Sequence, residues 1–158
     1  MNSIKNTLNF RHMFGGLVLG TIVTCGASAQ TPVTLPDDTP TMVGGIDAAC
    51  TGIAMQPEDM PRWNAYPLKI IAVGSGGQFM ADEQVTVSQG GHELVNVICG
   101  GPWVLLRLAP GEYEVNGSLE GKTAQAKAHV PKSGQGVVAL HFPALGGAVS
   151  PQDAAAKH

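Results

Sequence analysis

The feature that most constrains the fold is a two-residue alternation of apolar and polar side chains from Pro67 to Phe142. Turn signals such as Gly74–Gly77 interrupt it about every ten residues, and no long helical period appears. This spacing predicts an all-β chain folded as a seven-stranded antiparallel β-sandwich. The expected strands are 68–73, 84–88, 94–98, 103–108, 113–119, 123–130 and 138–142.

The tightest of the predicted turns lies between strands 103–108 and 113–119. Pro110 fixes φ at the value that the second position of a turn needs. Gly111 is expected to supply the positive φ that a type II turn requires next. Tyr113 follows the turn, where its ring can be buried while its hydroxyl is satisfied near a sheet edge.

The stretch Leu108–Val115 resembles the turn of transthyretin-like, carboxypeptidase-regulatory-like β-sandwich domains, which are also Ig-like in architecture. More narrowly, the chain resembles a group of small exported bacterial proteins with one such domain. In these a Gly-Pro-Trp strand (Gly101–Trp103) leads into the turn, and the first strand (Tyr66–Ile70) follows a segment like Gly52–Met55. The resemblance covers roughly Gly52 to Pro143. It implies a non-catalytic accessory domain.

Residues 1–29 have the pattern of a signal peptide. A basic leader precedes the apolar stretch Met13–Cys25, and the small residues Ala27–Ala29 form a site that a signal peptidase accepts. Cleavage between Ala29 and Gln30 would leave a periplasmic or secreted protein. Two alternatives are an uncleaved membrane anchor, and a lipoprotein in which Cys25 carries the lipid.

The charge of the remaining chain limits the classes of partner that it can bind. After the leader, seven Lys and Arg face twelve Asp and Glu, a net charge of about −5 with neutral histidines. Nucleic-acid binding would call for a basic patch, and so would binding to anionic lipid. We therefore expect neither nucleic acid nor, after cleavage, a membrane as the partner.

The segments outside the alternating region divide the chain further. Residues 30–45 are rich in proline and glycine without a period, so a flexible linker is predicted there. Residues 67–143 form the β-sandwich domain, and the Ala/Gly-rich residues 144–158 a disordered tail.

Residues 46–66 are interpreted as a lid segment with a short helix. Pro57–Asp59 resembles the first turn of a helix with acids near its positive end, and Pro61 is expected to limit that helix to about one turn. The segment is predicted to cover one end of the core. The alternative is a loop that grips a ligand.

Two cysteines, Cys50 and Cys99, remain after the leader. In an oxidising compartment an even pair predicts a disulfide bond. The alternatives are two buried thiols or a metal-binding pair, and no CxxC spacing supports a metal.

Histidines offer the other candidate chemistry. His129 and His141 fall on the outward faces of consecutive strands. With Val130 opposite Val138 they would be diagonal neighbours about 7–8 Å apart at Cα, and a tighter loop would separate them further. The register stays open, and two histidines without a third ligand are weak metal candidates.

The acidic pair Asp82-Glu83 and His92 lie at the two ends of a predicted hairpin. Acids in such turns are usually solvated, and we interpret these in that way.

The motifs of catalysis are missing from the sequence. It contains no Gly-x-Ser-x-Gly, no His-Glu-x-x-His and no phosphate-binding glycine-rich loop with its lysine. The prediction is a non-catalytic exported module, without a cofactor, that binds an unknown protein or envelope polymer. The alternative is a carrier of a small ligand or metal that uses the sandwich mouth or the surface histidines. The oligomeric state stays open.

The signal-peptide and cysteine arguments predict the form of the mature protein. Protein isolated from the periplasm should begin at Gln30, and its intact mass should be two hydrogens below that of the reduced chain. N-terminal sequencing and intact mass spectrometry check this. A retained leader, or two thiols that alkylate without reduction, would contradict it.

Overall fold

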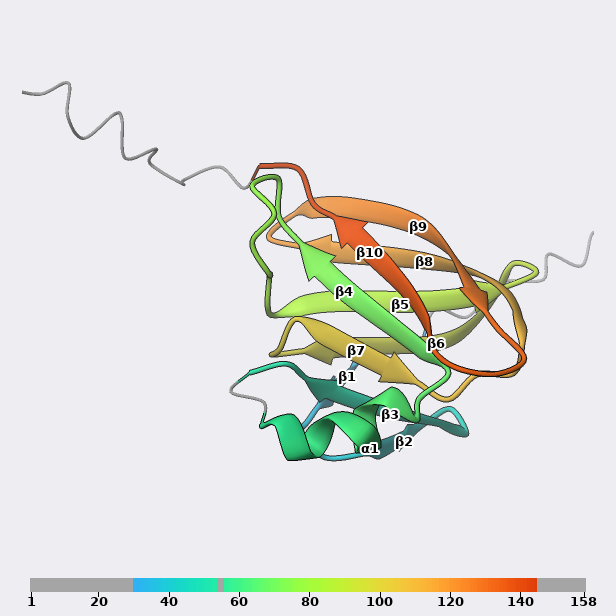
Figure 1. The fold of residues 1–158 in the computed structure, drawn as a ribbon. Helices are drawn as coiled ribbons and strands as arrows, with labels where there is room; N and C mark the ends of the chain where they lie inside the picture. The colour runs from blue at the N-terminus through green and yellow to red at the C-terminus, as the bar shows by residue number, and fades with distance from the viewer. Residues whose placement is uncertain (1–29, 54–55, 145–158) are drawn as a thin grey trace, which may run out of the picture.

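Two five-stranded sheets pack face to face (Figure 1). The structure is a computed structural model that describes residues 30–53 and 56–144. The first sheet has the strand order β1-β6-β5-β8-β9, and the second β10-β4-β7-β3-β2. The strands are β1 (Val33–Leu35), β2 (Thr41–Val43), β3 (Ile46–Thr51), β4 (Leu68–Val73), β5 (Glu83–Gln89), β6 (His92–Cys99), β7 (Trp103–Leu106), β8 (Gly111–Leu119), β9 (Lys122–Val130) and β10 (Gly136–His141). A 3₁₀ turn, η1 (Pro57–Asp59), precedes the short helix α1 (Met60–Asn64).

The predicted β-sandwich is confirmed, but its strand count and pairing differ from the prediction. The described residues hold ten strands, and the seven predicted segments correspond to β4 through β10. Two of the pairings are parallel, β10 with β4 and β1 with β6, so the sheets are mixed. β10 does not pair with β9, because the chain crosses from the first sheet to the second after β9.

The three additional strands lie where the sequence predicted a linker and a lid. β1 and β2 have three residues each, which is too short to show a period, yet Leu35 and Val43 are buried. β3 lies inside the second sheet between β7 and β2. Its central residues Ala48, Ala49 and Cys50 are fully buried, so this half of the predicted lid is core.

The short helix lies close to its predicted position. Pro61 does not end it, because α1 begins at Met60 and the proline occupies its first turn. A proline there removes no intrahelical hydrogen bond, which is why helices tolerate it at their start.

Three predictions fall outside the described residues. They are the cleavage between Ala29 and Gln30, the lipidation of Cys25, and the tail 144–158 except for Ala144. Within the described ranges, none of the helices has the length and apolar character that a membrane crossing needs.

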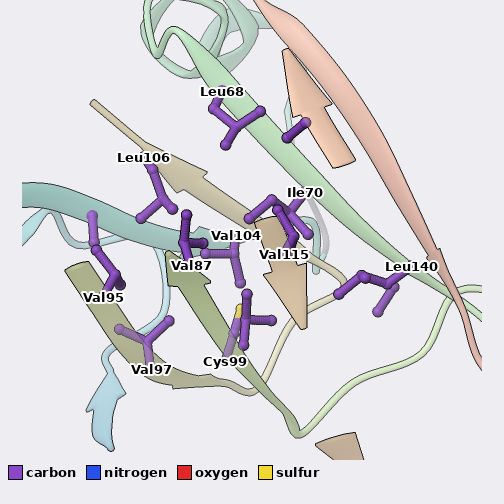
Figure 2. Packing of buried hydrophobic residues seen from close by; sticks show 14 of the residues in the cluster. Leu68, Ile70, Val87, Val95, Val97, Cys99, Val104, Leu106, Val115 and Leu140 are labelled. Carbon is purple, nitrogen blue, oxygen red and sulfur yellow. The ribbon is translucent and has the colours of Figure 1, made fainter. Parts of the chain in front are cut away.

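The core is the layer of side chains between the two sheets (Figure 2). Strands from both sheets contribute alternate residues to it, as a sandwich requires. The labelled members are Leu68, Ile70, Val87, Val95, Val97, Cys99, Val104, Leu106, Val115 and Leu140. Gly117 on β8 permits a close approach of the two sheets, because a Cβ there would lie 2.7 Å from Phe142 and 2.8 Å from Leu140.

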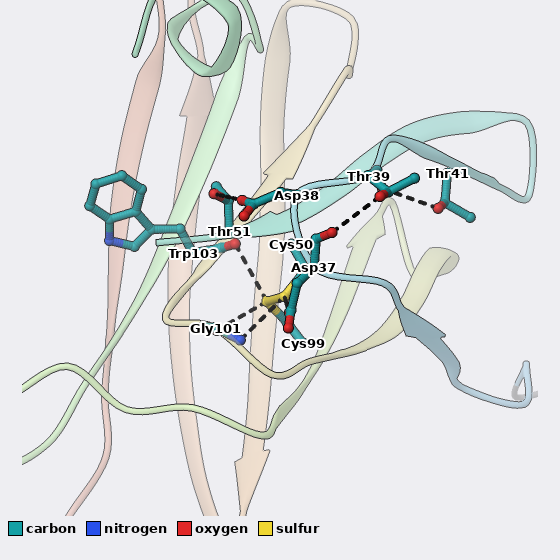
Figure 3. The surroundings of a disulfide bond; sticks show 9 residues. All are labelled: Asp37, Asp38, Thr39, Thr41, Cys50, Thr51, Cys99, Gly101 and Trp103. Atoms are coloured by element: carbon teal, nitrogen blue, oxygen red, sulfur yellow. Dashed lines mark hydrogen bonds between the residues drawn. A yellow bond between two sulfur atoms is a disulfide. The ribbon is translucent and has the colours of Figure 1, made fainter. Parts of the chain in front are cut away.

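The predicted disulfide is present and joins the two sheets (Figure 3). Cys50 on β3 bonds to Cys99 on β6, with their Cα atoms 5.4 Å apart. The backbone N–H of Gly101 donates to Cys50 Sγ at 3.3 Å. In the chain-entropy model a loop of this length stabilises the fold by roughly 4 kcal/mol.

Tyr113 behaves as predicted, whereas the turn before it has a different geometry. The ring is 4% exposed, and the hydroxyl donates to the carbonyl of Ala109 at 2.8 Å. This resembles the tyrosine corner of other β-sandwiches. Gly111 has φ of +158°, close to extended backbone and far from the roughly +80° of a type II turn. It is the first residue of β8.

The tyrosine contact leads to a stability prediction. Tyr113→Phe should cost about 1 kcal/mol, because the Ala109 carbonyl loses its donor, and Tyr113→Ala about 3–5 kcal/mol through the lost ring. Urea unfolding of the variants measures both. His129→Ala, on an exposed side chain, is the control and should change stability by less than about 0.5 kcal/mol. An unchanged stability of Tyr113→Ala would contradict the role of Tyr113 as a buried tyrosine corner.

Candidate functional site

The structure separates the two histidines that the sequence singled out. β9 and β10 belong to different sheets, so no hydrogen-bonded register brings His129 opposite β10. His129 lies beside Gly136, at the start of β10, and pairs with Glu112. His141 ends β10, about 17 Å further along the strand. Within the described ranges, no three metal-ligating side chains cluster.

The outer face of the second sheet carries exposed apolar side chains next to a buried polar one. Helix α1 covers the part of this face over β3 and β7. Its Trp63, together with Tyr66, forms a small buried cluster with Ala49 and Leu105 of the strands below. Gln135 fixes the end of the helix by donating to the carbonyl oxygens of Trp63 and Tyr66, at 2.9 Å each.

Beside the helix, apolar side chains of this face remain uncovered. We call them the outer patch: Ile71, Val73, Phe79, Trp103 and Val137. Phe79 and Val137 are 62% and 59% exposed. Ile71 lies opposite Trp103, and Val73 bridges to Phe79. The rings of Phe79 and Trp103 meet edge to face, 6.4 Å apart. The patch is therefore continuous across β10, β4, β7 and the segment after β4.

A lysine lies within this apolar surface. Lys69 is directly opposite Val137 in the sheet and is only 8% exposed. Its Nζ lies 3.5 Å from the centre of the Trp103 ring, a cation–π contact. Among the described residues no carboxylate pairs with it, whereas Arg107 pairs with Asp47 at 3.2 Å. Burial lowers the pKa of Lys69, because it penalises the charged form.

Trp103 itself has an unsatisfied donor. Its Nε1 is buried and makes no hydrogen bond in the described structure. Figure 3 shows the indole pointing away from the disulfide. Its neighbour Val104 belongs to the core, so Trp103 faces the outer side of the sheet. A buried donor without an acceptor costs about 1–3 kcal/mol. Two donors without an anionic or carbonyl acceptor, Lys69 Nζ and Trp103 Nε1, thus belong to side chains in direct contact.

Sequence reasoning missed this pair, although a signal was present. Lys69 lies between Leu68 and Ile70, whose side chains face the core, so the alternation assigns it to the outer face. Ile71 and Val73 share that outward phase, which marks an apolar outer surface. Nothing in the sequence indicated that α1 would cover only part of this face and leave the outer patch open.

The outer face of the first sheet is polar and shallow. A depression of about 430 Å³ there is lined by residues that include Glu114, Asn116, Gln125 and Lys127. One polar, solvated face is the ordinary condition of an antiparallel sheet. This face therefore offers less support for a binding site than the outer patch.

The comparisons with known proteins add no family. No protein-family model matches this chain, and no curated protein is detectably similar to it. The resemblance to carboxypeptidase-regulatory-like domains accordingly stays a prediction.

One further ionisable residue differs from its predicted environment. Glu83 was interpreted as a solvated turn acid, but it is 1% exposed and lies opposite Cys99. Its Oε2 has no hydrogen-bond partner. Burial raises the pKa of Glu83 to about 8; its own backbone N–H opposes the shift and the charge of Asp82 adds to it.

This burial makes the stability of the protein depend on pH. The unfolded chain loses the Glu83 proton near the ordinary pKa of 4.5, whereas the folded chain keeps it to about 8. Stability therefore falls as pH rises through this window, by roughly 5 kcal/mol in all, and is level above it. Urea unfolding between about pH 5 and pH 9 measures the slope. Glu83→Gln should remove it; an unchanged slope would contradict the assignment.

Proposed function

We propose that this protein is an exported, non-catalytic β-sandwich module that binds another protein through the outer patch. The signal-peptide pattern and the disulfide support export to the periplasm or beyond, since disulfides persist in oxidising compartments. The resemblance to carboxypeptidase-regulatory-like domains supports a non-catalytic role. The observation that carries the proposal is the continuous aromatic and aliphatic surface on the second sheet.

The composition of the outer patch supports a protein partner. Trp and Phe are enriched in the cores of protein interfaces, and contiguous exposed apolar surface marks interaction sites. Burying a side chain such as Phe79 or Val137 is worth roughly 1.5–3 kcal/mol.

The alternative is a carrier of a small ligand or metal that uses the sandwich mouth or the surface histidines. Its histidine site has less support, because His129 on β9 lies beside the start of β10 and His141 lies at the end of that strand.

Affinity capture tests the proposal. Immobilised mature protein should retain a partner protein from an envelope extract, and the double variant Phe79→Ser/Val137→Ser should lose it. Both side chains are exposed, so the main loss of stability should be that of the Phe79–Trp103 ring contact, about 0.5–1.5 kcal/mol. Mass spectrometry identifies the retained material, and thermal melts verify folding.

Met42→Ser provides the matched control, because Met42 is 66% exposed and apolar but lies outside the outer patch. It should capture the partner as the wild type does. Equal capture by the double variant, or no capture by any form, would contradict the proposed site. Retention of a polysaccharide or of peptidoglycan instead of a protein would show that the partner class is wrong.

A further inference from the structure

Lys69 is the one buried basic side chain in the described part of the chain. The exposed fraction of Lys69 is 8%, whereas the other described Lys and Arg residues are exposed. A buried charge is normally paired, because its desolvation is otherwise uncompensated. The contact with the Trp103 ring supplies only part of that compensation, because a ring face offers neither a full negative charge nor an acceptor oxygen.

The missing element is an acceptor. An ammonium has three donors and an indole has one, and neither group can accept a hydrogen bond. A carboxylate has two acceptor oxygens and a negative charge, so it supplies the ammonium with both a hydrogen-bond acceptor and an opposite charge. Lys69 Nζ lies 3.5 Å from the centre of the same ring that carries Nε1. The charge and the donors therefore favour an anionic oxygen ligand over a neutral apolar one.

The surroundings define what must flank that carboxylate. Val137 lies opposite Lys69, and Ile71 lies opposite Trp103. The Phe79 ring, from the segment after β4, packs edge to face with the Trp103 ring. A ligand that reaches Lys69 must lay apolar groups against these side chains. A small hydrated anion lacks such groups, whereas an acidic peptide segment with apolar neighbours has them.

We infer that Lys69 and Trp103 form a carboxylate-recognition site within the outer patch, and that the partner presents an acidic side chain flanked by apolar residues. This inference rests on the proposed function, because it names the chemistry that the same surface selects. The apolar side chains provide contact area and the ammonium provides selectivity. In this site the incoming carboxylate lies next to a charge that the described part of the fold leaves without a counterion.

Isothermal titration calorimetry with a pair of capped peptides tests the inference. The first peptide is acetyl-Val-Phe-Glu-Val-amide, and the second has Gln in place of Glu, so the two differ in charge but hardly in shape. The wild type should bind the Glu peptide about tenfold more tightly, as a charge-assisted hydrogen bond implies. Lys69→Met should remove this preference and retain the affinity for the Gln peptide.

Two further variants keep the outcome interpretable. Lys69→Arg retains the cation and should keep a preference for the Glu peptide even where Lys69→Met is unstable. Phe79→Ser should weaken both peptides equally. If the wild type binds both peptides equally and Phe79→Ser loses both, carboxylate recognition is overturned, but binding through the outer patch is supported. If neither peptide binds, the inference fails, and so does the idea that the outer patch binds a peptide segment.

Octanoate separates a peptide from a lipid-like carboxylate. It carries the same charged group on an unbranched apolar chain. The inference expects the Glu peptide to bind more tightly than octanoate. Tighter binding of octanoate that depends on Lys69 would overturn the peptide as the occupant.

Discussion

The apolar layer between the two sheets is the interaction on which the other features depend. The Cys50–Cys99 disulfide passes through this layer and holds β3 of one sheet against β6 of the other. The strands before β3 are attached to the same place, since the Asp38 N–H donates to the Cys50 carbonyl at 2.8 Å. The two three-residue strands could not remain in place alone, because isolated short strands are marginal in water. Their order follows from a core that already holds β3.

The same layer makes the outer face of the second sheet a rigid platform. Because Leu68, Ile70 and Ala72 are committed to the core, Lys69, Ile71 and Val73 must face outward. Helix α1 then covers one part of the platform and leaves the rest open. The open part carries the outer patch, so the candidate binding surface is a consequence of core packing on one side and of a short helix on the other.

Among the described residues, one basic and one acidic side chain are buried without an opposite charge, and their surroundings give them different roles. Glu83 lies opposite Cys99, and becoming neutral lowers the cost of its burial. Lys69 lies among exposed apolar side chains, where a partner can supply the missing charge. Position, not the pKa shift, therefore distinguishes a structural acid from a candidate recognition residue.

The sequence by itself determined the seven strands from β4 to β10, the inward phase of their side chains, the buried Tyr113 and the cysteine pair. Each of these depends on local periodicity or on residue count. Tertiary structure decided the first three strands, the two parallel pairings and the distance between His129 and His141, because each depends on which sheet a segment joins. It also decided the burial of Glu83 and the exposure of the patch around Lys69. Alternation assigns a side chain to a face, but only the packing of distant segments determines whether that face is covered.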